Sequence, residues 1–596
     1  MITRELARFA ADLRYEDIPA RVVQIAKRQV LSLLGAIFAG ARTGGVQAIA
    51  RALGRSESVG SDDRSLASAR ATAFPLGTTL PIEDAAYLNA CASMAHDMDD
   101  YIVFGHTGHS AVCGALAAGE ALNASGKDTI AALVAANELG ARLGGACLLG
   151  PQNGQLWSYI HQLGGAAATS RLLGLDARTT GHALGLALAQ PFFGLWPGFI
   201  GPDSKLLTAA EPLRTGIRAA FLASAGLTGP AEVIEGTTGL LGRIPFIALP
   251  GFFSGLGRGW LTETLSIKVA PGCAYVSTAV VAACEAISAL KKARGGALDP
   301  EEVERIEVKA SVLTLEMDRL AHPYIAAVSA GGSAAPSLTP VVVNFSTALS
   351  VAVALLDDGE LSPGALAEER LARDQDVILR FARRVQVEHD VARTANLLQE
   401  CDRVLDLAAL LEEVPLSELL QGAREQHAIL GGRPLASTVG DLLEILGALG
   451  PSGRDFARRL VERRARGAAS RLVSRVKRSL DEVVPAGDQH VPQVAPPERR
   501  GYDLGSRPLS SFRAVFGAGV TLRDRDGHVA QASCEVPPGA CGRDDAETDK
   551  LVHWKFHKHA DPILGAERAL ELERFVLSLE EQPSLAGLSA CLVKGS

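Results

Sequence analysis

The sequence predicts a mainly α protein, in which a large all-helical domain is joined to a smaller α/β domain. From Thr3 to about Gly242, apolar residues recur with helical period. After about Ser266, segments with alternating polar and apolar residues occur between the helices. With 596 residues, 47% of them apolar, the chain is long enough to fold into two or more domains with buried cores.

The helical domain is expected to span residues 1–265. An almost wholly apolar run, Val30 to Ala39, predicts a helix that is buried on most sides. Ser125 and Asp128 resemble a capping box at the start of another helix. Further helices are expected at 110–122, 128–143, 163–173 and 213–224.

The α/β domain is expected at 266–393 and 509–545. Alternation predicts strands at 303–315 and 384–388 and a hairpin within 518–536, around Asp526-Gly527. Residues 394–508 combine leucine-rich amphipathic helices, an arginine-rich stretch at 454–478 and a Pro/Gly-rich loop. We interpret them as a helical insertion whose arginines either face solvent or contact an acidic partner. Residues 546–596 are expected to form helices that return to the first domain.

The composition excludes several classes of protein. A net charge of -8 argues against a general nucleic-acid binder. The nine cysteines are scattered and form no CxxC pair, and charged residues among the first fourteen are unlike a signal peptide. The longest uncharged run, near 181–202, contains prolines and glycines and so does not suit a membrane span. We therefore expect a cytoplasmic protein without a nucleic-acid or membrane partner.

Residues 96–109 are the most informative stretch of the chain. They hold three carboxylates and three imidazoles, namely Asp97, Asp99, Asp100, His96, His106 and His109. Pro81 and an alanine-rich run to Ala95 predict a helix that ends just before the acids. Its dipole is expected to raise the pKa of a carboxyl group there, which suits a base working near neutral pH. The alternative is a solvated helix end with ordinary caps.

Residues 85–120 also resemble the signature of the MmgE/PrpD family. In that family a helix ending in Asp-aromatic-Asp-Asp-Thr leads through a short loop to His-Pro-Gly or His-Pro-Ser and an alanine-rich helix. Asp97 matches the first acid and His106 the histidine, whereas Met98 replaces the aromatic residue and Tyr101 the threonine. The family includes 2-methylcitrate dehydratases and cis-aconitate decarboxylases. The resemblance covers most of residues 1–393 and 510–592.

This resemblance implies a cofactor-independent, homodimeric lyase in which the α/β domain closes as a lid over a small carboxylate-bearing substrate. Asp97 or His106 would abstract a proton next to a carboxylate. Lys205 resembles the family lysine before a Leu-His pair, and its place at a helix start favours anion binding. The residues expected to contact the substrate are Lys268, Tyr101, Gln155, Thr208, Cys273, Ser277 and Tyr324. Asp97→Asn is expected to abolish turnover with little loss of stability.

Three departures from the family pattern bear on the substrate. Gln155, Thr208 and Ser277 stand where relatives carry histidines. A neutral amide or hydroxyl group does not donate a proton to a leaving hydroxide near pH 7. We therefore expect a substrate other than 2-methylcitrate, and little activity on cis-aconitate. An isomerase or epimerase on the same fold, or a non-catalytic scaffold, remains an alternative.

A metal site is not expected. His553 and His557 have the i, i+4 spacing of metal ligands, with His559 close by, but no helical glutamate partners them. Glycine pairs such as Gly164-Gly165 lack the preceding strand and following lysine of a phosphate-binding loop.

Overall fold

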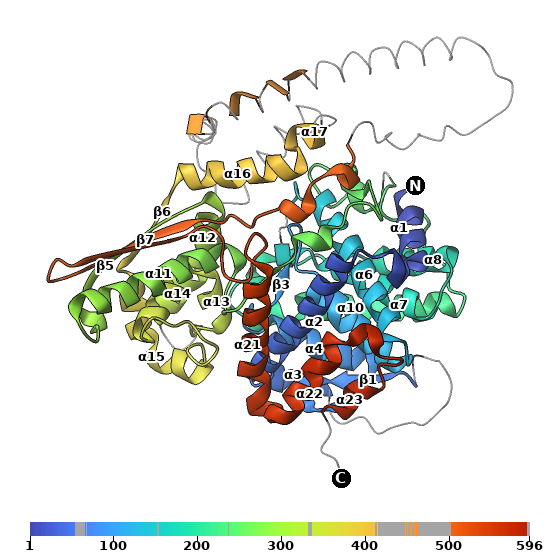
Figure 1. Cartoon of the computed structure of the whole chain (residues 1–596), viewed down its shortest axis with the longest axis horizontal. Coiled ribbons are helices and arrows are strands. Elements are labelled where there is room, and N and C mark those ends of the chain that lie inside the picture. The colour runs from blue at the N-terminus through green and yellow to red at the C-terminus, as the bar shows by residue number, and fades with distance from the viewer. Residues whose placement is uncertain are drawn as a thin grey trace.

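The computed structural model describes residues 1–53, 66, 68–151, 154–236, 238–331, 336–411, 414, 447–448, 450, 453–455, 458–459, 461–462 and 502–592. Over these residues helices dominate, with one four-stranded sheet and two small two-stranded sheets. The prediction of a mainly α fold is confirmed. Figure 1 shows a helical lobe beside a smaller lobe that contains the larger sheet.

The helical lobe is built from the N-terminal half of the chain. Its helices are α1 (Ile2–Asp12), α2 (Ala20–Gly40), α3 (Gly44–Leu53), α4 (Ile82–Met94), α5 (Gly108–Ala121), α6 (Gly126–Ala146), α7 (Ser158–Leu172), α8 (Ala177–Leu188), the short α9 (Trp196–Phe199) and α10 (Leu207–Ser224). Strands β1 (Arg70–Ala73) and β2 (Thr78–Pro81) form a hairpin before α4. Ser125 caps α6 by accepting a hydrogen bond from the backbone of Asp128 at 3.1 Å, as the sequence predicts.

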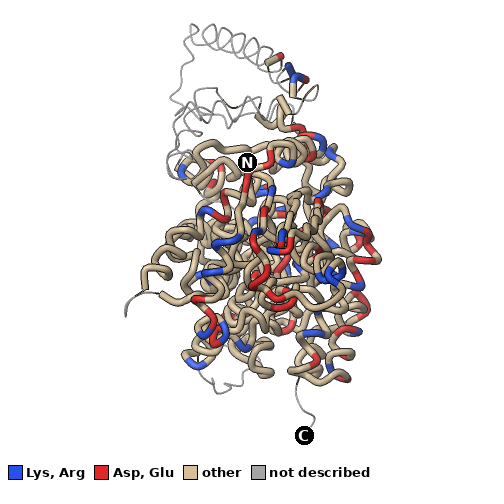
Figure 2. Tube along the Cα trace, turned by 90° about the vertical axis from the view of Figure 1, so that its left-hand side faces the viewer, with Lys and Arg blue, Asp and Glu red and all other residues tan. Residues whose placement is uncertain are grey.

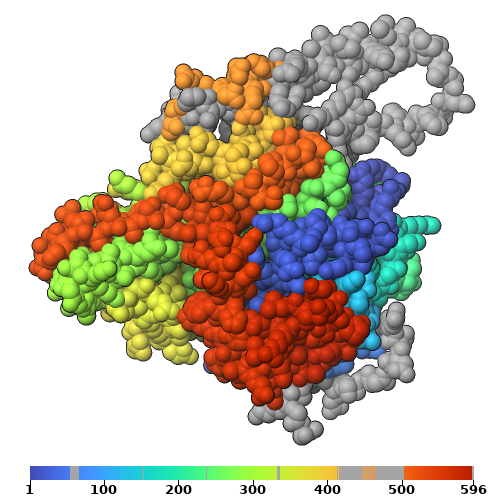
Figure 3. All heavy atoms as spheres, viewed as in Figure 1, coloured from blue at the N-terminus to red at the C-terminus, as the bar shows by residue number. Residues whose placement is uncertain are grey.

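Helices at the C-terminal end complete this lobe. They are α21 (Asp545–Leu564), α22 (Ala566–Leu577) and α23 (Gly587–Ala590). Their buried apolar side chains, among them Val552, Phe556 and Leu572, belong to the same hydrophobic core as α2. Figure 3 shows this C-terminal segment lying against the N-terminal helices. The two ends of the chain therefore stabilise one core.

The smaller lobe is organised around the four-stranded sheet. Its strands are β5 (Val303–Ala310), β6 (Val385–His389), β7 (Ala518–Asp524) and β8 (Val529–Cys534), in the order β6-β5-β7-β8. Its helices are α11 (Ala274–Arg294), α12 (Val312–Ala330), α13 (Pro340–Phe345), α14 (Thr347–Leu356) and α15 (Glu368–Ala382). Strand β5 pairs parallel with β6 and antiparallel with β7, and α11 and α14 pack against the sheet.

One predicted strand is shorter than expected. The alternation over 303–315 predicted a single strand, but the strand ends at Ala310 and Ser311 begins helix α12. Ser311 is the N-cap residue, in an extended conformation, and the apolar residues after it follow helical spacing as well as strand spacing. A short apolar run does not distinguish these two periods.

The described part of the expected insertion packs on the helical lobe. Helix α16 (Val391–Leu405) begins before residue 394, and α17 (Leu407–Leu411) follows it. Leu397, Val404 and Leu410 join the core of the helical lobe. Most of the arginine-rich stretch lies outside the described residues.

Helices α2 and α11 are long and apolar enough to cross a membrane by length and composition. Within the protein, however, 83% of the apolar window of α2 and 56% of that of α11 are buried. Buried core helices of water-soluble proteins can be equally long and apolar. Figure 2 shows Lys and Arg mixed with Asp and Glu over the described trace, with a group of acidic residues near the middle of the view.

Candidate active site

Asp97 lies in the loop that follows α4, in a backbone conformation that few residues adopt. Its φ is +53°, and its N–H donates to the carbonyl of Met94 at 3.2 Å. A non-glycine residue in this region costs about 1–3 kcal/mol, and such residues concentrate at functional sites. The turn directs the Asp97 carboxylate into the protein, where the residue is fully buried.

Lys205 neutralises the Asp97 carboxylate. It lies in a 3-10 turn, Asp203–Leu206, just before α10, and its Nζ is 2.7 Å from Asp97 Oδ1. Asn344 donates to the other carboxylate oxygen at 3.3 Å. Burial favours the neutral form of Asp97, but Lys205 and Lys268 hold its pKa below the ordinary value.

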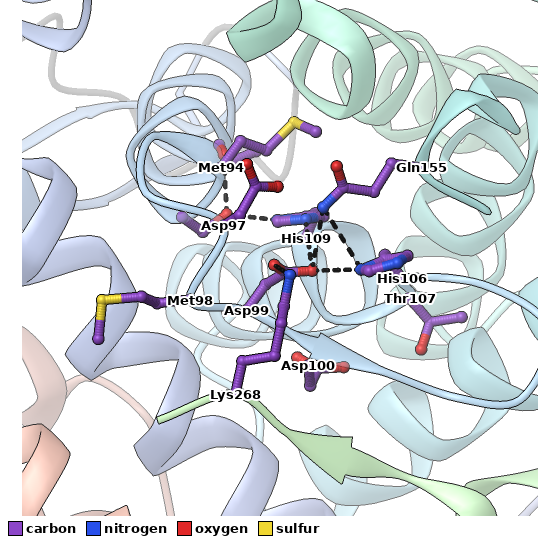
Figure 4. A network of polar contacts seen from close by, with 12 residues as sticks. Met94, Asp97, Met98, Asp99, Asp100, His106, Thr107, His109, Gln155 and Lys268 are labelled. Atoms are coloured by element: carbon purple, nitrogen blue, oxygen red, sulfur yellow. Dashed lines mark hydrogen bonds and ion pairs between the residues drawn. The ribbon is translucent and has the colours of Figure 1, made fainter. Parts of the chain in front are cut away.

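Asp99 is the centre of a larger network. Its Oδ2 lies 2.6 Å from His106 Nδ1 and 3.1 Å from His109 Nε2, and its Oδ1 lies 2.5 Å from Lys268 Nζ. Figure 4 shows His106, His109 and Lys268 turned toward this carboxylate. Burial opposes ionisation of Asp99, yet Lys268 and the two imidazoles hold its pKa well below the usual range. Asp99 is therefore a fixed negative charge.

His106 is positioned for proton transfer. Because ionised Asp99 only accepts hydrogen bonds, Nδ1–H of His106 donates to it, which leaves Nε2 for other partners. A Cβ placed on Gly154 would lie 4.0 Å from this Nε2, so no bulky side chain covers it there. Burial lowers the pKa of His106 below its ordinary value, although Asp99 opposes this effect. At neutral pH this shift favours the neutral form of the His106 ring.

A small cavity of about 30 Å³ lies beside these groups. Its wall consists of Asp97, His106, Gly154, Gln155, Trp196, Phe199, Lys268, Cys273, Tyr275, Met317 and Phe345. Phe199, Cys273 and Phe345 belong to the core of the smaller lobe, so the cavity lies between the two lobes. It has room for one or two water molecules. In this conformation the cavity is too small for a substrate of several carbon atoms.

The structure brings most of the expected site residues together. Asp97, His106, Lys268, Gln155 and Cys273 line the cavity, and Lys205 is bound to Asp97. Gln155 Nε2 lies 3.4 Å from both Asp99 Oδ2 and His106 Nδ1, so this substitution is at the site itself. Burial raises the pKa of the Cys273 thiol to about 11, and the thiol is protonated at neutral pH.

Four of the expected substrate contacts lie elsewhere. Tyr101 pairs with Ser266 across the small sheet formed by β3 (Asp100–Tyr101) and β4 (Ser266–Ile267). Ser277 donates to the carbonyl of Ala274, and the Tyr324 hydroxyl donates to the carbonyl of Ser337. Thr208 is partly exposed in the first turn of α10. None of these four side chains lines the described cavity.

The expected effect of the helix end on the acids is only partly observed. Of the three carboxyl groups, only that of Asp100 has a raised pKa, about 6, because burial and the charge of Asp99 disfavour its ionisation. Asp97 and Asp99 show the opposite shift, because each lies against a lysine. Direct ion pairs at less than 3 Å outweigh the dipole of the preceding helix.

Several groups at the site were not foreseen. Phe199, Tyr275 and Phe345 line the cavity, and the rings of Phe199 and Phe345 lie 5.4 Å from Lys205 Nζ. Lys555, on α21, donates to Ser32 Oγ at 2.8 Å and to the carbonyl of Met98, between the two aspartates. Burial lowers the pKa of Lys555 to about 7. No local sequence pattern marks these residues, because they come from segments far away in the chain.

The fold and site together define a two-lobe, mainly helical protein with buried lysine–aspartate pairs and one imidazole at an interlobe cavity. The model of the MmgE/PrpD N-terminal domain matches residues 4–244. Residues 4–244 thus resemble an MmgE/PrpD N-terminal domain, in agreement with the resemblance read from the sequence.

Similar proteins of known sequence carry decarboxylase names. A cis-aconitate decarboxylase of Aspergillus terreus is 28% identical over 295 residues, 46% of this chain and 58% of that protein. One from A. terreus strain NIH 2624 / FGSC A1156 is 29% identical over 311 residues, 49% of this chain and 60% of that protein. A cis-aconitate decarboxylase-like protein, oryM, of Aspergillus oryzae is 27% identical over 288 residues, 45% of this chain and 58% of that protein. The chain thus spans less than two thirds of the length of these relatives.

Proposed function

We propose that this protein is a lyase that removes CO₂ from a small di- or tricarboxylic acid, with His106 as the proton donor. The observation that carries the proposal is the Asp99–His106 pair at the wall of the cavity, next to Lys268. The family and the decarboxylase names of three relatives support a lyase of the decarboxylase or dehydratase type. The particular reaction and substrate are part of the proposal.

Loss of CO₂ breaks a carbon–carbon bond and leaves its electron pair on the substrate. Protonated His106 donates the Nε2 proton to the carbon that keeps this pair, and it then recovers a proton from solvent. Asp99 orients the ring and stabilises its charged form, because Nδ1–H donates to a fixed carboxylate. The ammonium group of Lys268 has three N–H donors, and Asp99 lies on one side of it. The positive charge of Lys268 therefore also attracts a substrate carboxylate.

Decarboxylation suits the site better than dehydration. Dehydration requires a base for the C–H proton and an acid for the leaving hydroxide, whereas decarboxylation requires one proton donor. Among the described residues on the cavity wall, His106 is the one imidazole, and Gln155 cannot act as an acid. Asp97 is less suited to act as a base than the sequence indicated, because it is bound to Lys205 and its pKa is below the ordinary value.

Dehydration is the second candidate, and pH separates the two. A decarboxylase needs protonated His106, so its kcat/KM rises as the pH falls toward and below about 6.5, the ordinary histidine pKa. A dehydratase that uses His106 as a base shows the opposite dependence. The lowered pKa of His106 moves the transition to the acid side of that value in either case.

The test is a panel of di- and tricarboxylic acids incubated with the purified full chain, with products identified by mass spectrometry. We expect loss of CO₂ from one class of acid, and little turnover of 2-methylcitrate or cis-aconitate, because Gln155 replaces a family histidine at the site. Loss of water as the main reaction would contradict the proposal. Turnover of cis-aconitate at an ordinary enzymatic rate, on the order of 1 per second or more, would show that Gln155 does not change specificity.

A further inference from the structure

Two helices at the C-terminal end bring together a second cluster of histidine and carboxylate groups. His553 and His557 lie one turn apart on α21, and Glu573 faces them from α22. His553 Nδ1 is 2.6 Å from Glu573 Oε1, and His557 Nε2 is 3.1 Å from Glu573 Oε2. One ligand atom from each residue lies within 4.8 Å of the other two.

This geometry suits a transition-metal ion. Zinc bonds to imidazole nitrogen and carboxylate oxygen are about 2.0–2.2 Å long, which places the ligand atoms of one ion roughly 3–3.5 Å apart. Two histidines at i and i+4 with one carboxylate are a known ligand set for such an ion. Since the three ligand atoms already lie within 4.8 Å of one another, movements of about 1–2 Å are enough to close them on one ion.

Asp561 supplies the supporting contact that metal-bound histidines usually have. Its Oδ1 lies 2.8 Å from His557 Nδ1, which fixes the ring with Nε2 toward Glu573. A carboxylate on the second ring nitrogen sets the tautomer and raises the basicity of a histidine ligand. The cluster therefore has both a ligand set and an outer partner for one of its ligands.

The described part of the chain holds two other clusters of histidine and carboxylate groups. They differ from this one because an aspartate in each is paired with a lysine or an arginine. Asp99, in the buried cluster, is paired with Lys268, and Asp524, beside Asp526 and His528, is paired with Arg294. In contrast, over the described residues the carboxylates of Glu573 and Asp561 contact histidine rings. The His553 side chain is 58% exposed and that of Glu573 6% exposed, so an ion from solvent reaches a partly enclosed carboxylate.

We propose that His553, His557 and Glu573 bind one divalent first-row transition-metal ion such as Zn²⁺, with Asp561 supporting His557 and water completing the coordination. The sequence argued against this site because no helical glutamate partners the two histidines. The structure supplies one from the next helix. A bound ion would join α21 to α22, and α21 also carries Lys555, which contacts the Met98 carbonyl behind the candidate active site.

The test is a Zn²⁺ titration of the metal-free full chain, followed by calorimetry and by competition with a chromophoric chelator. His557→Gln and Glu573→Gln are expected to remove one bound Zn²⁺ per chain. Asp561→Asn is expected to weaken the same site by about 10–100-fold. The matched control is His322→Gln, which alters an exposed histidine that is paired with an aspartate at i−4, outside the cluster.

A second readout separates metal binding from a folding defect. For each variant, the melting temperature is measured with Zn²⁺ and with a chelator, and the difference between the two is compared. We expect Zn²⁺ to raise the melting temperature of the wild type and of His322→Gln but not of Glu573→Gln. Equal Zn²⁺ affinity and equal thermal shifts in the wild type and in both ligand variants would overturn the proposal, as would no binding by the wild type.

Discussion

Asp97 and Asp99 lie on either side of Met98, and each forms a buried ion pair with one lysine, yet their surroundings differ. Asp97 has a strained backbone and contacts Lys205 and an amide. Asp99 contacts Lys268 and two imidazoles. Two similar buried ion pairs therefore have different structural roles. The Asp97 pair fixes the loop and a cation, whereas the Asp99 group orients a histidine toward the cavity.

The largest expected effect is on the Asp99 side. His106→Gln is expected to lower turnover by about 10²–10⁴-fold, the usual contribution of a general acid or base. Its melting temperature should change little, because the side chain lies at the cavity wall. Initial rates with the best acid from the panel provide the measurement, and His182→Gln, on α8, is the control. If the turnover of His106→Gln were within a few-fold of the wild-type value, Asp99 would not differ from Asp97 by orienting a catalytic histidine.

On the Asp97 side the expected effect is on stability. Lys205→Met leaves a buried carboxylate without its cation, and we expect the free energy of unfolding to fall by about 3–5 kcal/mol. Asp97→Asn leaves the lysine uncompensated and should also destabilise the protein, contrary to the expectation from sequence. The double variant should recover much of the loss, since no unpaired charge remains. Denaturant titrations of all three measure this coupling, and strictly additive losses would mean that the pair contributes nothing as a pair.

Lys555 contacts the carbonyl of Met98, the residue between the two aspartates. Its pKa is about 7 in the folded protein, against about 10.4 for an ordinary lysine. Between these values the unfolded chain binds more protons, so this group makes the protein more stable as the pH rises from 7 to 10. The contribution of Lys555 to stability is fully present above the unfolded pKa of about 10.4. It decreases as the pH falls and is lost once the pH has passed through the folded pKa of about 7. Lys555→Met should flatten this dependence by up to about 1.4 kcal/mol per pH unit, as measured by urea titration at several pH values. If the free energy of unfolding depended on pH in the same way in the wild type and in Lys555→Met, the pKa of Lys555 would not be lowered in the folded protein.

The smallest expected effect concerns Gln155. Its contacts with Asp99 and His106 are long, 3.4 Å each, so Gln155→Ala should change turnover by less than about tenfold. Thr208→Ala is the control, because Thr208 does not line the cavity. If Gln155→Ala lost as much activity as His106→Gln, the amide would have to be counted among the groups that transfer or hold the proton.

Much of the helical lobe and part of the site were predictable from local sequence. Helix α4 between Pro81 and Met94, the cap at Ser125, and the cluster around Asp97 and His106 all arise from residues that are close in the chain. Lys205 and Lys268 were found through the family resemblance. Their partners were not foreseen, because an ion pair such as Lys205–Asp97 joins residues 108 positions apart and depends on the packing of two helices.

Other features depended on tertiary structure alone. Lys555 reaches Met98 across 457 positions of sequence, and Phe345 reaches the cavity from the smaller lobe. Tyr324 was expected at the site, but its ring packs against Gly201, where it leaves no room for a side chain. Alignment to a family pattern gives the order of residues along the chain, whereas their distance from the cavity depends on how the lobes pack.

The proposed reaction depends on His106 as the group that transfers the proton. The most direct test is the pH dependence of kcat/KM for the wild type and for His106→Gln with the same acid substrate. We expect the wild type to show one ionisation below about 6.5, with activity greatest on the acid side, and the residual activity of the variant to lack it. The same ionisation in both enzymes would contradict this role of His106, because another group would then carry the proton.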